Sequence, residues 1–147
     1  MLVATLVSAL LVAATIFLHF KVLKLSSKLV FAERRELRWP MLFVIAIIFI
    51  AHILEVILYS FAYLIMETFL GVGSLTGALG PRVDNLSDLF YFSIASYTTL
   101  GIGDILPEGP LRIVAGVESL NGLVLIAWSS SFTYLMMERL WGGNGNS

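Results

Sequence analysis

The sequence predicts an all-α membrane protein with three membrane-spanning helices and one shorter, re-entrant helix. Hydrophobic residues make up 59% of the 147 residues and charged residues only 13%, against roughly a quarter charged in soluble domains. Three apolar runs are long enough to cross a bilayer, which takes about 20 residues. A fourth apolar run is short and aromatic, and a glycine-bearing segment follows it.

The first apolar run predicts an N-terminal membrane helix over residues 1–23. Met1 to Phe20 contains no charged residue. A cleavable signal peptide is the alternative, but such a peptide carries its positive charges before the apolar stretch, and here they follow it. We therefore expect the helix to be retained.

A basic linker follows over residues 24–39, and it predicts the orientation of the chain. Six of the nine lysine and arginine residues lie between Lys21 and Arg38. Basic loops face the cytoplasm, so we expect the N-terminus outside and the C-terminus in the cytoplasm of a multi-pass cell-membrane protein. Basic clusters beside a membrane also attract anionic headgroups, so lipids are expected partners.

The next two long runs predict an outer helix over residues 40–70 and an inner helix over residues 110–139. Each begins at a proline, which is favoured in the first helical turn. The glycine-rich residues 71–84 between them predict an exposed loop. The expected divisions are thus a first helix at 1–23, a basic linker at 24–39, a main domain at 40–139 and a short tail at 140–147.

Residues 86–98 predict a re-entrant helix, which Asn85 can cap. This stretch is too short to span about 30 Å of hydrocarbon, and its four aromatic residues are too many for a solvated loop. Irregular backbone at membrane depth is tolerated only where it is buried in protein or faces water. Residues 99–104 are therefore expected to line a cavity.

The segment from Thr98 to Asp104, TTLGIGD, has the residues needed to surround a dehydrated cation with oxygen atoms. Consecutive carbonyls point at one axis when ordinary and left-handed dihedrals alternate, and Gly101 and Gly103 enter the left-handed region without a Cβ penalty. Thr99 can add its hydroxyl as the innermost ligand. The alternative is an ordinary glycine-bearing turn between two membrane segments.

The outer end of this segment is expected to be acidic, which would concentrate cations there. The acidic residues Asp84, Asp88, Asp104 and Glu108 outnumber the arginines Arg82 and Arg112.

The stretch LFYFSIASYTTLGIGD, followed by a long helix with Gly122, resembles the pore module of two-transmembrane potassium channels over about Pro40 to Arg139. The resemblance implies that four copies close around an axis as a homotetramer. It implies an ion filter formed by Thr99, Leu100, Gly101, Ile102 and Gly103, with potassium ions held at the first four. It places Gly122 at the hinge of the inner helix.

The resemblance also assigns supporting and lining roles. Filter support is expected from Thr98, Asp104, Glu118 and Tyr97, and pore lining from Ile126, Ser130, Thr133, Tyr134 and Met137. A stripe of serine and threonine on a membrane helix can equally serve helix-to-helix hydrogen bonding. The sequence differs from the pattern of these potassium channels at two positions near the filter. Ile102 replaces the usual aromatic residue of the filter, and Ala95 stands where many channels of this family carry an acidic residue.

Glu55 and Glu118 lie inside membrane spans, where an ionisable residue is a functional candidate by default. We expect a polar brace that reaches the re-entrant helix through Ser96 or Tyr97, with a protonation-sensitive gate as the alternative. His52 lies one turn before Glu55, but a metal site from this pair has no third ligand within reach by sequence.

These observations predict passive conduction of monovalent cations, with potassium as the expected ion. The alternatives are a poorly selective cation channel and, in a different class, a non-conducting membrane subunit that docks a partner. The sequence has no nucleotide loop, calcium loop or catalytic triad, so neither an enzyme nor a nucleic-acid partner is expected. No cofactor is expected apart from potassium ions in the filter.

Overall fold

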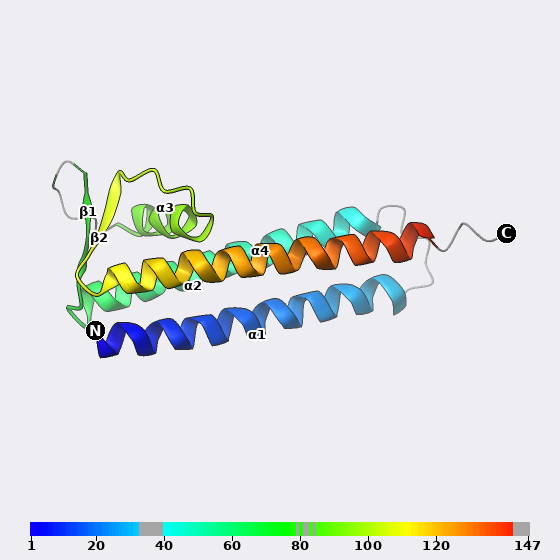
Figure 1. Cartoon of the computed structure of the whole chain (residues 1–147), viewed down its shortest axis with the longest axis horizontal. Helices are drawn as coiled ribbons and strands as arrows, with labels where there is room; N and C mark the ends of the chain where they lie inside the picture. Colours follow the sequence, from blue (N-terminus) through cyan, green and yellow to red (C-terminus); the bar gives the residue numbers. More distant parts are fainter. Residues whose placement is uncertain (33–39, 79, 81–82, 84, 143–147) are drawn as a thin grey trace.

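The computed structural model describes residues 1–32, 40–78, 80, 83 and 85–142. Three long helices, α1 (Leu2–Ala32), α2 (Pro40–Thr68) and α4 (Leu111–Gly142), run side by side (Figure 1). In the described part of the chain, these three helices are long and apolar enough to cross a membrane. The all-α membrane class is confirmed.

The first helix is longer than the sequence pattern indicated. It continues to Ala32, beyond the predicted boundary at residue 23, so the first part of the expected 24–39 linker is helical. Lysine and leucine are good helix formers, and charge does not interrupt a helix that has left the hydrocarbon. The ammonium groups of Lys21 and Lys24 lie over the rings of Phe17 and Phe20, at 5.0 and 5.9 Å from the ring centroids. Residues 33–39, with three arginines, lie outside the described residues.

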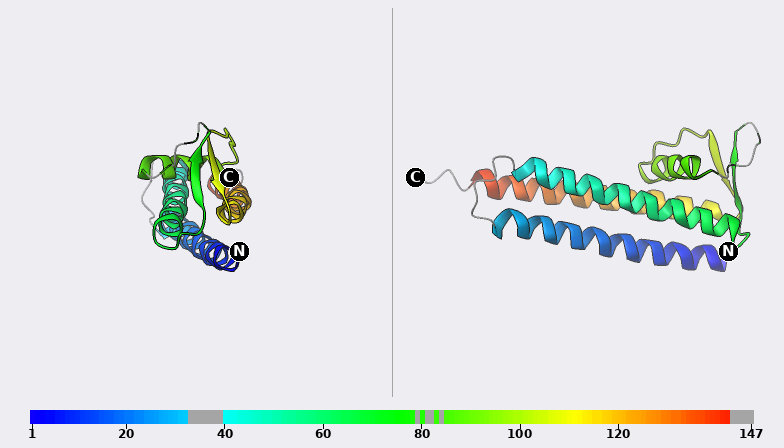
Figure 2. Two further views of the ribbon diagram at one scale, coloured as in Figure 1. Left: turned by 90° about the vertical axis from the view of Figure 1, so that its left-hand side faces the viewer. Right: turned by 180° about the vertical axis from the view of Figure 1, so that it is seen from behind.

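The α1 helix packs against both α2 and α4 through a narrow face of small and polar residues (Figure 2). The Thr15 hydroxyl accepts a hydrogen bond from the Asn121 amide at 2.8 Å. Small residues allow membrane helices to approach closely, and their polar groups join the helices. The buried residues of this face are Ala4, Ser8, Thr15, His19, Leu23 and Ser26.

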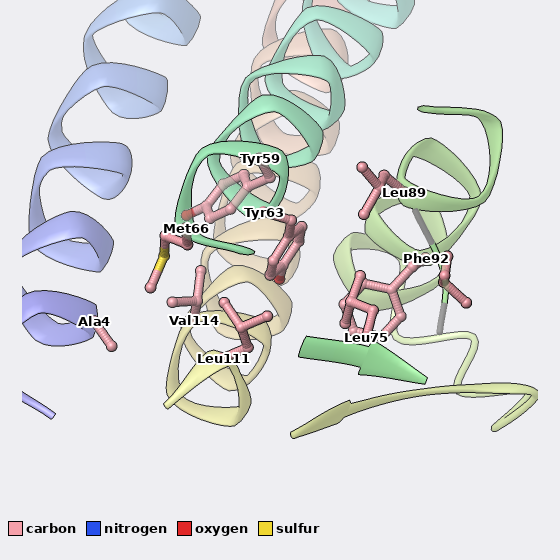
Figure 3. Packing of buried hydrophobic residues seen from close by; sticks show 10 residues of the cluster. Ala4, Tyr59, Tyr63, Met66, Leu75, Leu89, Phe92, Leu111 and Val114 are labelled. Atoms are coloured by element: carbon pink, nitrogen blue, oxygen red, sulfur yellow. The ribbon is translucent and has the colours of Figure 1, made fainter. Parts of the chain in front are cut away.

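A short helix, α3 (Leu86–Tyr97), lies against one end of the bundle and contacts α2 and α4. The main hydrophobic core lies where these three helices meet (Figure 3). The rings of Tyr63 and Phe92 pack edge to face there, with centroids 5.2 Å apart. The core also contains Tyr59, Met66, Leu75, Leu89, Leu111 and Val114. It holds α3 firmly beside α2 and α4.

The expected loop at residues 71–84 contains a β-strand. β1 (Ser74–Gly77) pairs antiparallel with β2 (Ile105–Glu108), in a register that places Ser74 opposite Glu108. The Ala78 amide also donates to the Asp104 carbonyl at 2.7 Å. The ribbon therefore anchors the chain immediately after the predicted filter. The sequence did not indicate these strands because each has four residues and its partner is about 30 positions away.

The remaining helix ends differ slightly from the sequence boundaries. α2 ends at Thr68 against the predicted residue 70, and α3 ends at Tyr97 against 98. α4 begins at Leu111 and ends at Gly142, against 110 and 139. Thr98 caps α3, and its amide donates to the carbonyls of Ile94 and Ser96.

Candidate functional site

The α3 helix presents the candidate filter from its C-terminal end. Its N-terminus is capped by Asn85, whose side chain accepts a hydrogen bond from the Asp88 amide at 2.8 Å. At its other end, the Thr98 hydroxyl donates to the Ile94 carbonyl at 2.7 Å. The C-terminal end of a helix carries a partial negative charge. It therefore favours a cation close to Thr98 and Thr99.

The backbone after α3 alternates between two regions of dihedral space. Thr99, Gly101 and Gly103 have φ values of 58°, 60° and 82°, whereas Leu100 and Ile102 do not have positive φ. This alternation is the one that turns successive carbonyls toward one side of a strand. A left-handed conformation costs about 1–2 kcal/mol for a residue with a side chain. Thr99 is thus a strained position that the surrounding structure must hold.

The same segment is exposed in the single chain. Every residue from Thr98 to Asp104 is exposed, including Leu100 at 63% and Ile102 at 57%. One strand cannot surround an ion, and exposed apolar side chains at membrane depth need protein or lipid around them. In one chain, this segment therefore does not enclose an ion site by itself.

Asp104, at the C-terminal end of the segment, is tied to α3 by Tyr91. The Tyr91 phenol is hydrogen-bonded to the Asp104 carboxylate, and this bond raises the pKa of Tyr91. Asp104 Oδ1 also accepts from the Ile105 amide at 3.0 Å. The candidate filter itself has no phenol, because Ile102 stands where the resemblance expects an aromatic residue. The structure supplies one from the neighbouring helix instead.

A cleft of about 500 Å³ lies between the segment, α3 and the start of α4. Phe92 and Ile102 both line it, so the ring of one and the aliphatic side chain of the other share this space. Ala95, at the position where the resemblance expects an acid, lines the same cleft. In the single chain the filter therefore has no acidic brace from Ala95 and has open space behind Ile102.

Gly122 lies where α4 touches the end of α3. A Cβ atom at this glycine would come within 2.1 Å of the Tyr97 carbonyl oxygen and 3.0 Å of the carbonyl carbon. α4 continues without a break through this position. In this structure, Gly122 permits a close approach of two helices, which the hinge assignment did not anticipate.

Glu118 forms a brace between α4, α2 and α3. It is completely buried, and its carboxylate accepts from the Tyr63 hydroxyl at 2.5 Å and from the Ser93 hydroxyl at 2.6 Å. The Ser93 oxygen also lies 2.9 Å from the Val56 carbonyl. The contact expected through Ser96 is made by Ser93, one turn earlier, because residues three apart share a helix face.

Glu55 lies in a second buried cluster, to which four helices contribute. Its carboxylate is 2.9 Å from His19 Nδ1, 3.2 Å from His52 Nδ1 and 2.5 Å from the Tyr97 hydroxyl. The Ser129 hydroxyl is 3.0 Å from Nε2 of both histidines. Sequence reasoning found Glu55, His52 and Tyr97 but missed His19. The only available signal was a histidine inside an otherwise apolar span.

The five predicted pore-lining residues lie along one groove of about 470 Å³ between α2 and α4. Ile126, Ser130, Thr133, Tyr134 and Met137 line it together with Ile45, His52 and Ser129. Of the predicted acidic mouth, Asp88, Asp104 and Glu108 are described, whereas Asp84 and Arg82 lie outside the described residues. The Arg112 guanidinium donates to the Pro107 carbonyl at 3.1 Å.

Comparison with known proteins agrees with this geometry over most of the chain. Residues 41–139 match a family model described as an ion channel. The match contains α3, the segment after it and nearly all of α2 and α4, and it leaves out α1. No curated protein and no solved structure matches the chain.

Proposed function

This chain belongs to the ion channel family, and on that premise we propose that it conducts monovalent cations passively across the cell membrane, with a preference for potassium. The observation that carries the proposal is the backbone after α3. Its positive φ angles at Thr99, Gly101 and Gly103 alternate with ordinary ones. Stacked carbonyls from Thr99, Leu100, Gly101 and Ile102 would replace the water around an ion.

The conducting unit in this proposal is a homotetramer. A single strand from Thr99 to Gly103 is exposed and cannot enclose an ion, whereas four copies around one axis can. Leu100 and Ile102, both more than half exposed in one chain, would then be covered by neighbouring subunits. Crosslinking or native mass measurement in detergent should detect four chains. A protein found only as monomers and dimers would contradict this assembly.

The proposed orientation places α3 and the β-ribbon outside and the groove along α4 toward the cytoplasm. The described lysines of α1, Lys21, Lys24 and Lys28, lie at the helix end remote from α3. The positive-inside tendency assigns that end to the cytoplasm. Cations would then enter past Asp104 and continue along the groove lined by Ser130 and Thr133.

A poorly selective cation channel is the second candidate, and the filter's surroundings favour it. Ile102 has no hydroxyl to tie it to α3, and the cleft behind it leaves about 500 Å³ of open space in the single chain. A loosely held cage would discriminate less between sodium and potassium if cavity size contributes to selectivity. The tie between Tyr91 and Asp104 opposes this loosening at the outer end only.

The deciding experiment is ion flux through the purified protein in liposomes, with opposed potassium and sodium gradients. Potassium selectivity predicts a reversal potential that follows the potassium gradient. A reversal potential that responds equally to both ions would identify the poorly selective channel. Protein-free liposomes are the control, and absence of flux from correctly assembled protein would favour a subunit that only docks a partner.

A further inference from the structure

Both histidines of the chain meet at one buried carboxylate. His19 on α1 and His52 on α2 are the only two histidines among 147 residues. Their Nδ1 atoms lie 2.9 and 3.2 Å from the two oxygens of Glu55. His19 and Glu55 are completely buried, and α1 lies outside the part of the chain that matches the ion channel family. The cluster lies behind the candidate filter, at Tyr97, and contains none of residues 99–103.

The two imidazoles are oriented in the same way. Each directs Nδ1 at the Glu55 carboxylate and Nε2 at the Ser129 hydroxyl, at 3.0 Å in both cases. Histidines that bind a metal usually donate their other ring N–H to a nearby oxygen, which fixes the ring and the tautomer. Ser129 can accept from both Nε2–H groups because a hydroxyl oxygen has two lone pairs.

The hydrogen-bond count shows that the cluster lacks a positive charge. Two neutral imidazoles, the Tyr97 phenol and the Ser129 hydroxyl carry one polar hydrogen each, which makes four. The contacts number six: each Nδ1 to Glu55, Tyr97 to Glu55, His52 to the Tyr97 oxygen, and each Nε2 to Ser129. With Glu55 ionised, four hydrogens cannot serve all six contacts, even if His52 Nδ1–H is shared between Glu55 and Tyr97. The cluster also buries a net negative charge, which is costly.

We propose that His19, His52 and Glu55 form an intramembrane binding site for a divalent transition-metal ion of the zinc type. A metal bound to both Nδ1 atoms and the carboxylate needs no hydrogen in those contacts and supplies the missing charge. Both Nε2–H groups then donate to Ser129, and Tyr97 donates to Glu55, so every remaining contact has its hydrogen.

The distances suit such an ion. The three ligand atoms all lie within 4.8 Å of one another. Zinc binds imidazole nitrogen and carboxylate oxygen at about 2.0–2.2 Å, which places tetrahedral ligand atoms roughly 3.3 Å apart. His19 Nδ1 lies 2.9 Å from one Glu55 oxygen and His52 Nδ1 lies 3.2 Å from the other, so these pairs would move slightly apart. Any pair nearer the 4.8 Å limit would move closer together. Imidazole and carboxylate ligands suit zinc and its neighbours better than potassium.

The groove between α2 and α4 gives the ion a route to the site. His52 and Ser129 line it, and the His52 side chain is 17% exposed. The fourth coordination position would be filled by water from this groove or by the Tyr97 oxygen, which is 2.8 Å from His52 Nδ1. A bound ion would join α1 and α2 beside the residue that ends α3.

The test is metal binding by the purified full-length protein in lipid nanodiscs. The protein is stripped with a chelator, then titrated with Zn²⁺ and, separately, with Co²⁺, whose visible spectrum reports its ligands. We expect one ion per chain, with a cobalt spectrum typical of nitrogen and oxygen ligands. His19→Gln and His52→Gln should each lose this binding, and Ser129→Ala should weaken it about 10- to 100-fold. Glu138→Gln, an exposed carboxylate on α4, should bind as the unmodified protein does.

Failure to bind Zn²⁺ at micromolar concentration in the unmodified protein would overturn the proposal, even if the histidine variants do not fold. Binding that survives in both histidine variants would overturn it as well. A chain that binds no metal but takes up one proton as the pH is lowered would identify a proton as the missing charge and reject the metal. None of these readouts depends on ion conduction, so they are independent of the proposed channel function.

Discussion

The two sides of the α3 C-terminus are held in different ways. On one side, residues 99–104 are exposed and carry three positive φ angles. On the other side, Tyr97, Glu55 and Glu118 are buried, and every buried side-chain nitrogen or oxygen in the described part of the chain has a hydrogen-bond partner. These buried residues form a frame behind the candidate filter that is complete within one chain. The candidate filter is uncovered in one chain and depends on its neighbours only in the proposed tetramer.

This difference predicts two classes of mutant. Changes in the frame should first reduce folding and assembly, because they disturb packing and hydrogen bonds that one chain already makes. Changes in the exposed strand should first reduce conduction and leave the fold in place. A frame mutant that loses a buried hydrogen bond or gains a clash and still has normal stability would break the distinction, and so would a filter mutant that unfolds the protein.

The largest effect is expected for Gly122→Ala. Its Cβ would lie 2.1 Å from the Tyr97 carbonyl oxygen, which is backbone and cannot rotate away. Overpacking costs about 1–3 kcal/mol and sometimes more, against about 1 kcal/mol gained by replacing glycine in a helix. We expect a clear fall in the melting temperature of the purified assembly, measured by thermal unfolding in detergent.

Gly116→Ala is the matched control for this variant. It adds the same methyl group to the same helix, and apart from its chain neighbours and the adjacent helix backbone no described atom lies within 4 Å of the new Cβ. We expect the melting temperature to stay unchanged or to rise. Equal melting temperatures for Gly122→Ala and the unmodified protein would mean that α3 and α4 are not held together as closely as in this structure.

Gly101→Ala should abolish or strongly reduce potassium flux while the protein remains folded. The residue has a φ of 60°, and the nearest atom to an added Cβ is the Thr99 carbonyl oxygen at 3.9 Å. The cost is therefore one of backbone conformation, about 1–2 kcal/mol in each of four subunits. The loss of conduction is measured as potassium flux in liposomes. Ile102→Val is the control, because this residue does not have a positive φ. Unchanged flux would mean that TTLGIGD is not the conducting filter.

Replacing Glu118 tests whether the stability of the frame depends on the carboxylate charge or only on a side chain of the same size and hydrogen-bonding capacity. In Glu118→Gln, the amide oxygen can accept from Tyr63, and the amide NH₂ can donate to Ser93, whose hydroxyl then turns to the Val56 carbonyl at 2.9 Å. We expect nearly normal stability. Glu118→Ala leaves the buried Tyr63 hydroxyl without this acceptor, which costs about 1–3 kcal/mol.

Thermal unfolding and flux from pH 5 to 8 measure both variants. If both assemble and conduct normally across this range, Glu118 is neither a brace nor a proton gate. A Gln variant that folds normally but loses a pH response of the unmodified channel would support the gate.

The sequence predicted the elements that depend on local pattern. The three spans followed from uninterrupted apolar runs, and the start of α3 followed from Asn85, whose cap is local. The β-ribbon could not be foreseen, because β1 is stabilised by pairing with a segment about 30 residues later.

The sequence indicated which polar residues form the frame better than it indicated which residues they contact. Glu55, Glu118 and Tyr97 stood out as polar groups near the re-entrant helix, but their partners depend on how the helices rotate about their axes. His19 lies 36 positions before Glu55, on a helix that is apolar on nearly all sides, so only the docking of α1 brings them together. The role of Gly122 likewise depends on the approach of α3.

The smallest effect is expected for Tyr91→Phe, which removes the one side-chain tie from α3 to Asp104 among the described residues. Tyr91 is half-buried and lies outside the hydrophobic core, and Asp104 keeps the Ile105 amide as a partner, so stability should hardly change. The outer end of the filter should become more mobile, and we expect flux or potassium preference to fall by a few-fold at most. The hydrogen bond raises the pKa of Tyr91, so the phenol keeps its proton beyond its usual pKa of about 10. The difference between Tyr91→Phe and the unmodified channel should therefore be constant from pH 6 to 9 in liposome flux. A difference that disappears within this range would mean that another titrating group, rather than the Tyr91 phenol, holds Asp104.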